Sequence, residues 1–526
     1  MIIWQVAREY AGLAEAGGVK NVVCSLSEGL SQLGNKVTLF IPQYGCSDFS
    51  NVLDFEQIPN SSFDIEVDTK KYSVSFAKGK INDVEIIFLV TECFLKKNGV
   101  YTYTKEEEAL NPSFIRGHGH IDSLEIEMVF QKSLIKFLKN FSIKPDVIHC
   151  HDATTGFVPA FANTKENKDF FANTNFIVTI HNAGPAYHHE INGIEKAKAL
   201  TGLPYEILQQ GLLNNSVEPY LLSAFYGKLT TVSPWYAKEV LDPNNKNTQG
   251  LSEAFFKNNV KIYGITNGID FENYNPTDIN KSHLPYSYNP ENLSLEGKYQ
   301  CRKGFFTYFA SPISNNQNKA QEMLSEGLEQ FGYLEKMQDD TVIFAYHGRL
   351  VHQKGLDILA AAMPLCLQQN SNIRFVITGQ GDKRLEDNQI KLAKDFPGKV
   401  LYLRGYNKTI ARLCVAISDY IVLPSFFEPC GLEDFIASIL GTIPVAHKTG
   451  GLQKIQDKVT GFLYENNEAK ELSNKLLSLI DFKIQNKEKY FAMIQNAAKE
   501  VHCNYDWINV IKKYYIPLYL EKNKKK

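Results

Sequence analysis

The chain has 526 residues, of which 44% are hydrophobic and 22% are charged, and its formal net charge is -2. Hydrophobic cores usually divide beyond roughly 250–300 residues, so this length predicts two domains of similar size. The near-zero charge argues against nucleic acid or an anionic membrane as a partner, and no apolar run approaches the ~20 residues that cross a bilayer. Nine scattered cysteines without a CxxC pair indicate reduced thiols, and the short apolar N-terminus is unlike a signal peptide, so we expect a cytoplasmic protein.

Short apolar runs alternate with helical patterns along most of the chain. The strand-like runs are KVTLFIP, VEIIFLV, DVIHCHD, FIVTIHN and KLTTVSP in the first half, and TVIFAYHGR, IRFVITGQG, VLYLRG, YIVLPS and TIPVAHK in the second. Strands rich in Val, Ile and Leu, each followed by a helix, are typical of parallel sheets covered on both faces. The pattern therefore predicts the doubly wound α/β class, with two such domains meeting across a cleft.

Composition suggests where the domains divide. The strand-like KIYGITNGID closes a first domain at residues 1–270, and an Asn-, Pro- and Ser-rich stretch at 271–303 is expected to be a linker. A second domain follows at 304–500, and residues 501–526 hold an aromatic helical segment and a charged tail, KNKKK.

No GxGxxG motif opens the chain, which argues against a Rossmann oxidoreductase.

Ligands of open α/β sheets bind beyond the carboxyl ends of the strands, so the residues after each strand are the first candidates. Gly17 and Gly18 follow the first strand and could let the backbone approach an anion, although a plain tight turn explains them equally well. His149 and His151 share one face of a strand, but without further ligands nearby a polar strand end facing a sugar is favoured over a metal site. His181 closes the next strand, where ligand contact and a scaffold role are both open.

Two positive residues follow the first strand of the second series. Arg349 and Lys354 lie five residues apart in HGRLVHQKG, a spacing that lets both reach one diphosphate, although two solvated surface cations remain the alternative. Glu428 follows the strand YIVLP, where a carboxylate can accept hydrogen bonds from ribose or sugar hydroxyls. Residues 429–432 can begin a helix whose amides face phosphates.

Taken in order, these segments resemble the bacterial glycogen synthase and plant starch synthase family. The resemblance rests on REYAGLAEAGGVKNVV, PDVIHCHDATTGFVPAF, FIVTIHNAGPAY, LTTVSPWYAKEV, ITNGIDFENYNP, HGRLVHQKGLDIL, SDYIVLPSFFEPCGL, GTIPVAHKTGGL and NYDWINVIKKYYIPLYLE. It implies the GT-B fold, with two Rossmann-like domains facing a cleft and a last helix that crosses back to the first domain. It also implies transfer of glucose, with retention, from ADP-glucose or UDP-glucose to the non-reducing end of an α-1,4-glucan, without a metal or other cofactor.

The resemblance also assigns roles by position. It places Arg349 and Lys354 at the departing diphosphate, Glu428 at the donor and His181 beside the transferred glucose. The other residues that it implies are Glu15, Gly17, Gly18, Cys430, Gly431 and Leu432 at the donor, Tyr406 stacked on adenine, and Asp152 and Asn267 near glucose and acceptor.

Three positions depart from the family pattern. Glu15 replaces the family's lysine, Asn21 replaces an aspartate and Glu433 replaces a threonine. Because a carboxylate at position 15 cannot neutralise a diphosphate, we expect Glu15 to pair with a cation or to face the sugar. Two alternatives remain open: a retaining GT-B glycosyltransferase with another acceptor, and a glucan-binding protein that has lost catalysis.

Overall fold

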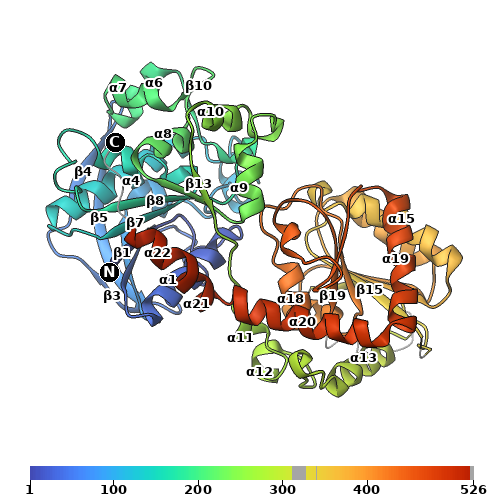
Figure 1. Cartoon of the computed structure of the whole chain (residues 1–526). Coiled ribbons are helices and arrows are strands. Elements are labelled where there is room, and N and C mark those ends of the chain that lie inside the picture. The colour runs from blue at the N-terminus through green and yellow to red at the C-terminus, as the bar shows by residue number, and fades with distance from the viewer. Residues whose placement is uncertain (311–326, 339, 522–526) are drawn as a thin grey trace. The chain divides into compact units, whose positions relative to one another are not determined.

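The computed structural model describes residues 1–310, 327–338 and 340–521. The chain forms two compact units, shown in Figure 1. The first unit contains Met1–Gly268 together with Trp507–Lys526, and the second contains Ile269–Asp506. The expected charged tail at 522–526 lies outside the described residues. In the described part of the chain, no helix combines the length and apolar character needed to span a membrane.

The first unit is built on a ten-stranded sheet with the order β13-β12-β8-β7-β1-β2-β6-β5-β3, with β4 paired to β5. Its parallel strands are β1 (Ile2–Val6), β2 (Lys36–Pro42), β6 (Val84–Val90), β7 (Val147–His151), β8 (Asn175–Ile180), β12 (Lys228–Thr231) and β13 (Ile262–Gly264). An antiparallel extension adds β3 (Leu53–Gln57), β4 (Phe63–Val67) and β5 (Lys70–Ile81). A small separate sheet holds β9 (Ile191–Asn192), β10 (Leu212–Leu213) and β11 (Ser216–Val217).

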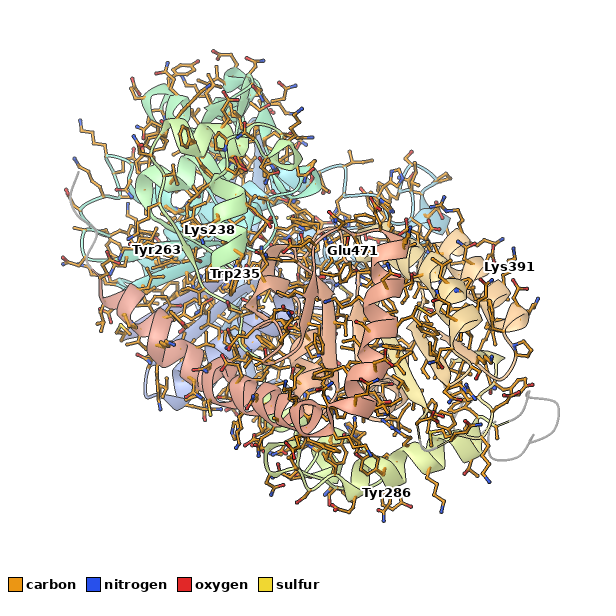
Figure 2. The ribbon with its side chains drawn as sticks, turned by 45° about the vertical axis from the view of Figure 1, so that its right-hand side comes forward. Trp235, Lys238, Tyr263, Tyr286, Lys391 and Glu471 are labelled. Carbon is orange, nitrogen blue, oxygen red and sulfur yellow. The ribbon has the colours of Figure 1, made fainter. Side chains whose placement is uncertain are left out.

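Helices surround this sheet. They are α1 (Val19–Gln32), α2 (Glu92–Leu95), α3 (Lys105–Leu110), α4 (Ser123–Asn140), α5 (Val158–Ala162), α6 (Ile194–Thr201), α7 (Tyr205–Leu208), α8 (Pro219–Tyr226), α9 (Pro234–Leu241) and α10 (Leu251–Lys257). The start of α9 shows how local sequence sets a boundary: the Ser233 hydroxyl accepts the Tyr236 N–H at 3.0 Å, and Pro234 occupies the first turn. Figure 2 shows Lys238 on the exposed side of this helix.

The C-terminal segment packs on the first unit (Figure 1). It consists of α21 (Trp507–Val510), a π-helical turn at Ile511–Tyr515 and α22 (Ile516–Leu520). Trp507 lies so close to Gly268 that a Cβ on the glycine would stand 2.7 Å from the indole ring. This close approach explains why the Met1–Gly268 segment ends on a glycine.

The second unit has a seven-stranded sheet with the order β14-β17-β16-β15-β18-β19-β20. Its strands are β14 (Glu329–Gly332), β15 (Val342–His347), β16 (Ile373–Gly379), β17 (Val400–Arg404), β18 (Tyr420–Leu423), β19 (Ile443–His447) and β20 (Phe462–Tyr464), all parallel to their neighbours except β14. Its helices are α11 (Phe271–Tyr274), α12 (Ile279–Ser282), α13 (Glu296–Tyr308), α15 (Leu356–Gln369), α16 (Lys383–Asp395), α17 (Lys408–Ala416), α18 (Glu433–Ile439), α19 (Ala469–Gln485) and α20 (Lys487–Tyr505).

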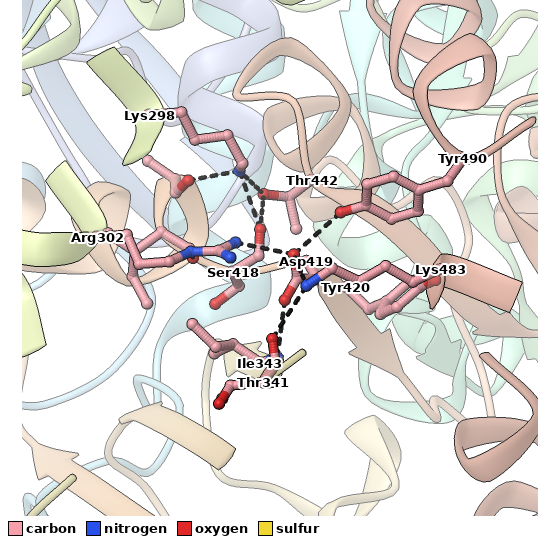
Figure 3. A network of polar contacts seen from close by, with 12 residues as sticks. Lys298, Arg302, Thr341, Ile343, Ser418, Asp419, Tyr420, Thr442, Lys483 and Tyr490 are labelled. Carbon is pink, nitrogen blue, oxygen red and sulfur yellow. Dashed lines mark hydrogen bonds and ion pairs between the residues drawn. The ribbon is translucent and has the colours of Figure 1, made fainter. Parts of the chain in front are cut away.

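The stretch expected as a linker, 271–303, belongs to the second unit. Its polar composition suggested exposure, but Lys298 and Arg302 of α13 are only 1% and 7% exposed. The Lys298 ammonium donates to the carbonyls of Ala416 and Ser418 at 2.5 and 2.9 Å, and further contacts complete its shell, as Figure 3 shows. Because a buried ammonium needs acceptors, these contacts fasten α13 to the core of the unit.

Asp419 is the centre of this polar network (Figure 3). Its carboxylate pairs with Arg302 at 2.9 Å and Lys483 at 3.0 Å, and it accepts the Tyr490 hydroxyl at 3.0 Å and the Ile343 N–H at 2.9 Å. Burial alone would raise the pKa of Asp419, but the charges of Arg302 and Lys483 hold it well below its ordinary range. The carboxylate therefore joins β15, β18, α13, α19 and α20.

We expect Asp419→Asn to lower the free energy of unfolding by about 3–5 kcal/mol, because it leaves two buried cations without their counter-charge. Chemical denaturation, followed through the unfolding transition of the second unit, measures this loss. The depressed pKa means that the stabilisation is present above the unfolded carboxyl pKa of about 4 and disappears as the pH falls below it. The difference in the free energy of unfolding between the wild type and Asp419→Asn should therefore become smaller in acid.

The matched control is Glu465→Gln, which neutralises a carboxylate that pairs with Lys448 but is 69% exposed. An exposed pair of this kind contributes at most about 1 kcal/mol. Equal losses in the two variants would contradict the central role of Asp419.

Candidate functional site

At the carboxyl edge of the first unit's sheet, Asp152 follows β7 and His181 follows β8. Asp152 has a φ of 63°, a left-handed conformation that costs a non-glycine residue about 1–3 kcal/mol and often marks functional sites. Its carboxylate accepts the His181 N–H at 2.9 Å and the Tyr220 hydroxyl at 3.0 Å. The structure therefore brings Asp152 and His181 together, as their positions after adjacent strands predict.

The His181 ring also lies against a second histidine. Its Nε2 is 3.0 Å from Nδ1 of His151, and the ring centroids are 5.3 Å apart. Burial lowers the pKa of His181, and burial with its histidine neighbours holds the pKa of His151 well below the ordinary value. Both rings are therefore neutral near pH 7.

The glycine loop is held by a residue that the sequence analysis did not single out. The buried Glu9 carboxylate accepts the N–H groups of Gly17 at 2.7 Å and Ala16 at 3.2 Å, and the Tyr101 hydroxyl at 3.3 Å. The exposed Gly17 thus has its amide bonded to Glu9, and its contact with a donor phosphate stays a prediction. Gly18 has open space around its Cα, since a Cβ there would meet nothing within 4 Å.

Glu15 forms an ion pair with Lys20 and accepts the Gly12 N–H at 2.7 Å. These contacts, that to Lys20 first, lower the pKa of Glu15. The pairing is one of the two outcomes expected for a carboxylate at this position.

Asn267 lies just beyond β13 and is only 6% exposed. Its Oδ1 is buried and has no hydrogen-bond partner within the described residues. Because an unsatisfied buried oxygen is costly, this atom suits contact with a ligand donor.

In the second unit, Lys354 and Glu428 form one ion pair. The ammonium lies 2.6 Å from the Glu428 carboxylate, which also accepts the Ser425 hydroxyl at 3.3 Å. Burial would lower the pKa of Lys354, but the carboxylates of Glu433 and Glu428 raise it above its ordinary value. Gly355 follows with a φ of +67°, and a Cβ there would stand 1.8 Å from the Pro424 carbonyl oxygen, so only glycine lets the loop close this tightly.

Arg349 and Tyr406 also lie beyond carboxyl ends of strands in this unit, after β15 and β17. Both are exposed, Tyr406 to 66%. Across the described chain, no carboxylate pairs with the Arg349 guanidinium. Its planar donors are therefore available to an anion.

The loop at Cys430–Leu432 is organised by Lys454, a second residue that the sequence analysis missed. The buried Lys454 ammonium donates to the carbonyls of Cys430, Gly431 and Gly451 at 2.6, 3.0 and 3.2 Å, and it pairs with Asp434 at 3.0 Å. In a planar peptide the carbonyl and the following N–H point in opposite directions. Turning these carbonyls inward therefore directs the N–H groups of Gly431 and Leu432 away from Lys454.

Glu433 partly fills this loop. Its carboxylate accepts the Leu432 N–H at 3.3 Å. Although burial would raise its pKa, the charge of Lys354 lowers it. The departure from the family's threonine thus adds a second negative group near Lys354.

No group of three or more His, Cys, Asp or Glu side chains suited to a metal ion occurs in the described ranges.

Two doubly wound α/β units with a C-terminal segment that returns to the first are the architecture of GT-B glycosyltransferases. The starch synthase catalytic domain family matches residues 2–255, and the family of glycosyl transferases group 1 matches residues 334–500. The chain is 31% identical to the glycogen synthase of Thermodesulfovibrio yellowstonii over 523 residues, which cover 98% of this chain and 96% of the relative. It is 27% identical to the glycogen synthase of Exiguobacterium sibiricum, with 98% of both chains covered.

Among solved structures, the chain is similar to the catalytic domain of starch synthase IV from Arabidopsis thaliana bound to ADP and acarbose. The TM-score is 0.76 at 23% identity, with 98% of each chain covered, which supports the fold. The chain belongs to the glycogen and starch synthase family of glycosyltransferases.

We expect the double variant Lys454→Met, Asp434→Asn to speed hydrogen–deuterium exchange in the Cys430–Leu432 loop about tenfold, because losing a hydrogen-bonded anchor costs about 1–1.5 kcal/mol. Changing both partners avoids leaving Asp434 buried and unpaired. Mass spectrometry of the exchanged protein measures the effect, and Lys448→Ala, an exposed lysine nearby, is the control. Native-like exchange of the loop in the double variant would show that Lys454 does not organise it.

Proposed function

We propose that the second unit binds the nucleoside diphosphate of a glucosyl donor, with Arg349 and Lys354 neutralising the diphosphate as it leaves. The chain is a glycogen or starch synthase, a glycosyltransferase that transfers glucose to an α-1,4-glucan. The observation that carries the proposal is the charged Lys354, paired with Glu428 beside the exposed Arg349. A ligand site that holds its cations in place needs little rearrangement when charge develops on the leaving group.

In this proposal the bond between C1 of glucose and the diphosphate oxygen breaks ahead of attack. Negative charge then grows on the diphosphate, and the glucose ring becomes oxocarbenium-like. Arg349, Lys354 and the outward N–H group of Gly431 stabilise the diphosphate. His181, Asp152 and Asn267 have the roles at the sugar that the family resemblance assigns. The acceptor 4-hydroxyl attacks C1 from the face that the diphosphate leaves, which gives retention, and its proton passes to an oxygen of the departing phosphate.

ADP-glucose is the proposed donor, with UDP-glucose as the alternative. The support is that the catalytic domain of starch synthase IV, which shares the fold at a TM-score of 0.76, is bound to ADP in its solved structure. The exposed ring of Tyr406 offers a surface on which a base can stack.

We expect Arg349→Ala and Lys354→Ala each to lower kcat about 10²–10³-fold, the usual cost of losing one preorganised charge contact. Initial rates of nucleoside diphosphate release in the presence of glycogen measure this effect. Co-sedimentation with glycogen should change little, because the glucan does not need these cations. Lys391→Ala removes an exposed lysine of α16 (Figure 2) and is the matched control. Normal turnover in either site variant would refute the diphosphate assignment.

Glu15→Lys should lower the KM for the nucleotide sugar by about three- to tenfold, because it exchanges an anion for the cation that the family carries there. Glu15→Gln removes only the negative charge and should give a smaller change in the same direction. Circular dichroism checks that the fold is intact. Identical kinetics in wild type and both variants would mean that the loop has no part in donor binding.

A further inference from the structure

One face of the first unit's sheet carries a buried row of polar side chains. Gln5 of β1 is in register with His149 of β7, His151 is in register with Thr179 of β8, and Thr179 is in register with Thr230 of β12. All five side chains are at most 2% exposed. Polar groups buried this deeply are stabilised by bonds to one another, so their donors and acceptors are coupled, although the Gln5 Nε2 has no hydrogen-bond partner within the described residues.

The row divides into two hydrogen-bonded chains. In one, His149 bonds the Tyr519 hydroxyl of α22 through Nδ1 at 2.7 Å and Thr179 through Nε2 at 2.6 Å, and Thr179 bonds Thr230 at 2.6 Å. In the other, the Gln5 amide oxygen lies 2.8 Å from Nε2 of His151, whose Nδ1 lies 3.0 Å from Nε2 of His181. Only the second chain reaches the candidate site.

The second chain determines which nitrogen carries each proton. The Gln5 side chain faces Nε2 of His151 with its amide oxygen, which only accepts hydrogen bonds, so in this arrangement His151 carries its proton on Nε2. Neutral His151 then has a lone pair on Nδ1, which requires His181 to donate from its own Nε2. Since His181 is also neutral, its Nδ1 is left without a proton.

The backbone of His181 is fixed as well, because Asp152 accepts its N–H at 2.9 Å. No partner for Nδ1 of His181 is present among the residues that the structure describes, and the residue is partly exposed. The ring therefore presents one bare acceptor nitrogen outward.

We propose that Gln5 and His151 are positioning residues that hold His181 as the Nε2–H tautomer, so that its Nδ1 accepts a hydrogen bond from a hydroxyl of the bound sugar. The sugar contact rests on the proposed function, whereas the tautomer does not. A lone pair directed at the sugar favours the positive charge that the glucose ring gains as the diphosphate leaves. An N–H or an imidazolium in its place would oppose that charge.

Two substitutions of His151 separate this role from a merely structural one. In His151→Asn the amide oxygen takes the place of Nδ1 and still accepts the His181 proton, whereas His151→Leu fills similar space without an acceptor. Thr230→Val is the matched control, because it removes one buried hydrogen bond from the same sheet face but from the other chain.

The direct readout is the tautomer of His181 in the full-length protein, from the ¹⁵N chemical shifts of the labelled imidazoles near pH 7.5, assigned with His181→Gln. We expect Nε2–H in wild type, His151→Asn and Thr230→Val, and loss of that single tautomer in His151→Leu. The expected loss of kcat in His151→Leu is about tenfold, the cost of one hydrogen bond at the sugar, with His151→Asn restoring most of it.

A wild-type protein with the proton on Nδ1 of His181, or equal behaviour of His151→Asn and His151→Leu, would overturn the proposal. If the protein transferred no glucose but His181 still showed the Nε2–H tautomer, the proposed function would fail and the tautomer assignment would stand.

Discussion

The ion pair between Lys354 and Glu428 is the interaction on which the second unit's site depends. A mostly buried ammonium keeps its charge only beside a counter-charge, and Glu428 at 2.6 Å provides one, with Glu433 adding to it. Arg349 is exposed, and no carboxylate pairs with it in the described part of the chain. In the proposed function the diphosphate is therefore met by Arg349, by the Lys354 ammonium that Glu428 holds in place, and by the Gly431 N–H group of the Cys430–Leu432 loop.

Buried charges also shape the parts around the site. Lys454 turns three carbonyls inward and so directs the Gly431 amide outward, while Glu9 in the first unit accepts the Gly17 and Ala16 amides and fixes the glycine loop. In the core of the second unit, Asp419 joins helices and strands that are far apart in sequence. Each of these groups is costly to bury and is therefore fully bonded, which makes its surroundings rigid.

Most of the parallel strands could be predicted because buried parallel strands are continuously apolar. The antiparallel strands β3, β4, β5 and β14 were not predicted. VEIIFLV corresponds to β6 at Val84–Val90, and KVTLFIP to β2 at Lys36–Pro42. The candidate residues after strand ends could be found for the same reason, since chain order places them at one edge of a sheet. Their roles in binding and catalysis stay predictions.

What the sequence did not reveal depends on contacts between distant residues. Nothing local to Lys298 shows that it donates to carbonyls more than a hundred positions away, so the 271–303 stretch was interpreted as a linker. Lys454 contacts carbonyls more than twenty residues earlier, and the bond of Glu9 to Gly17 depends on how the loop folds back. Composition and spacing carry no signal for such pairings.

The central claim is that the chain extends an α-1,4-glucan with glucose from a nucleotide sugar. The most direct test incubates the protein with glycogen and ADP-glucose labelled with ¹⁴C in the sugar, in parallel with labelled UDP-glucose, and digests the washed glucan with β-amylase. Our account predicts label in the glucan, greater with ADP-glucose, and its release as labelled maltose, which requires α-1,4 linkage at non-reducing ends. Free labelled glucose from both donors, with no label in the glucan, would contradict it.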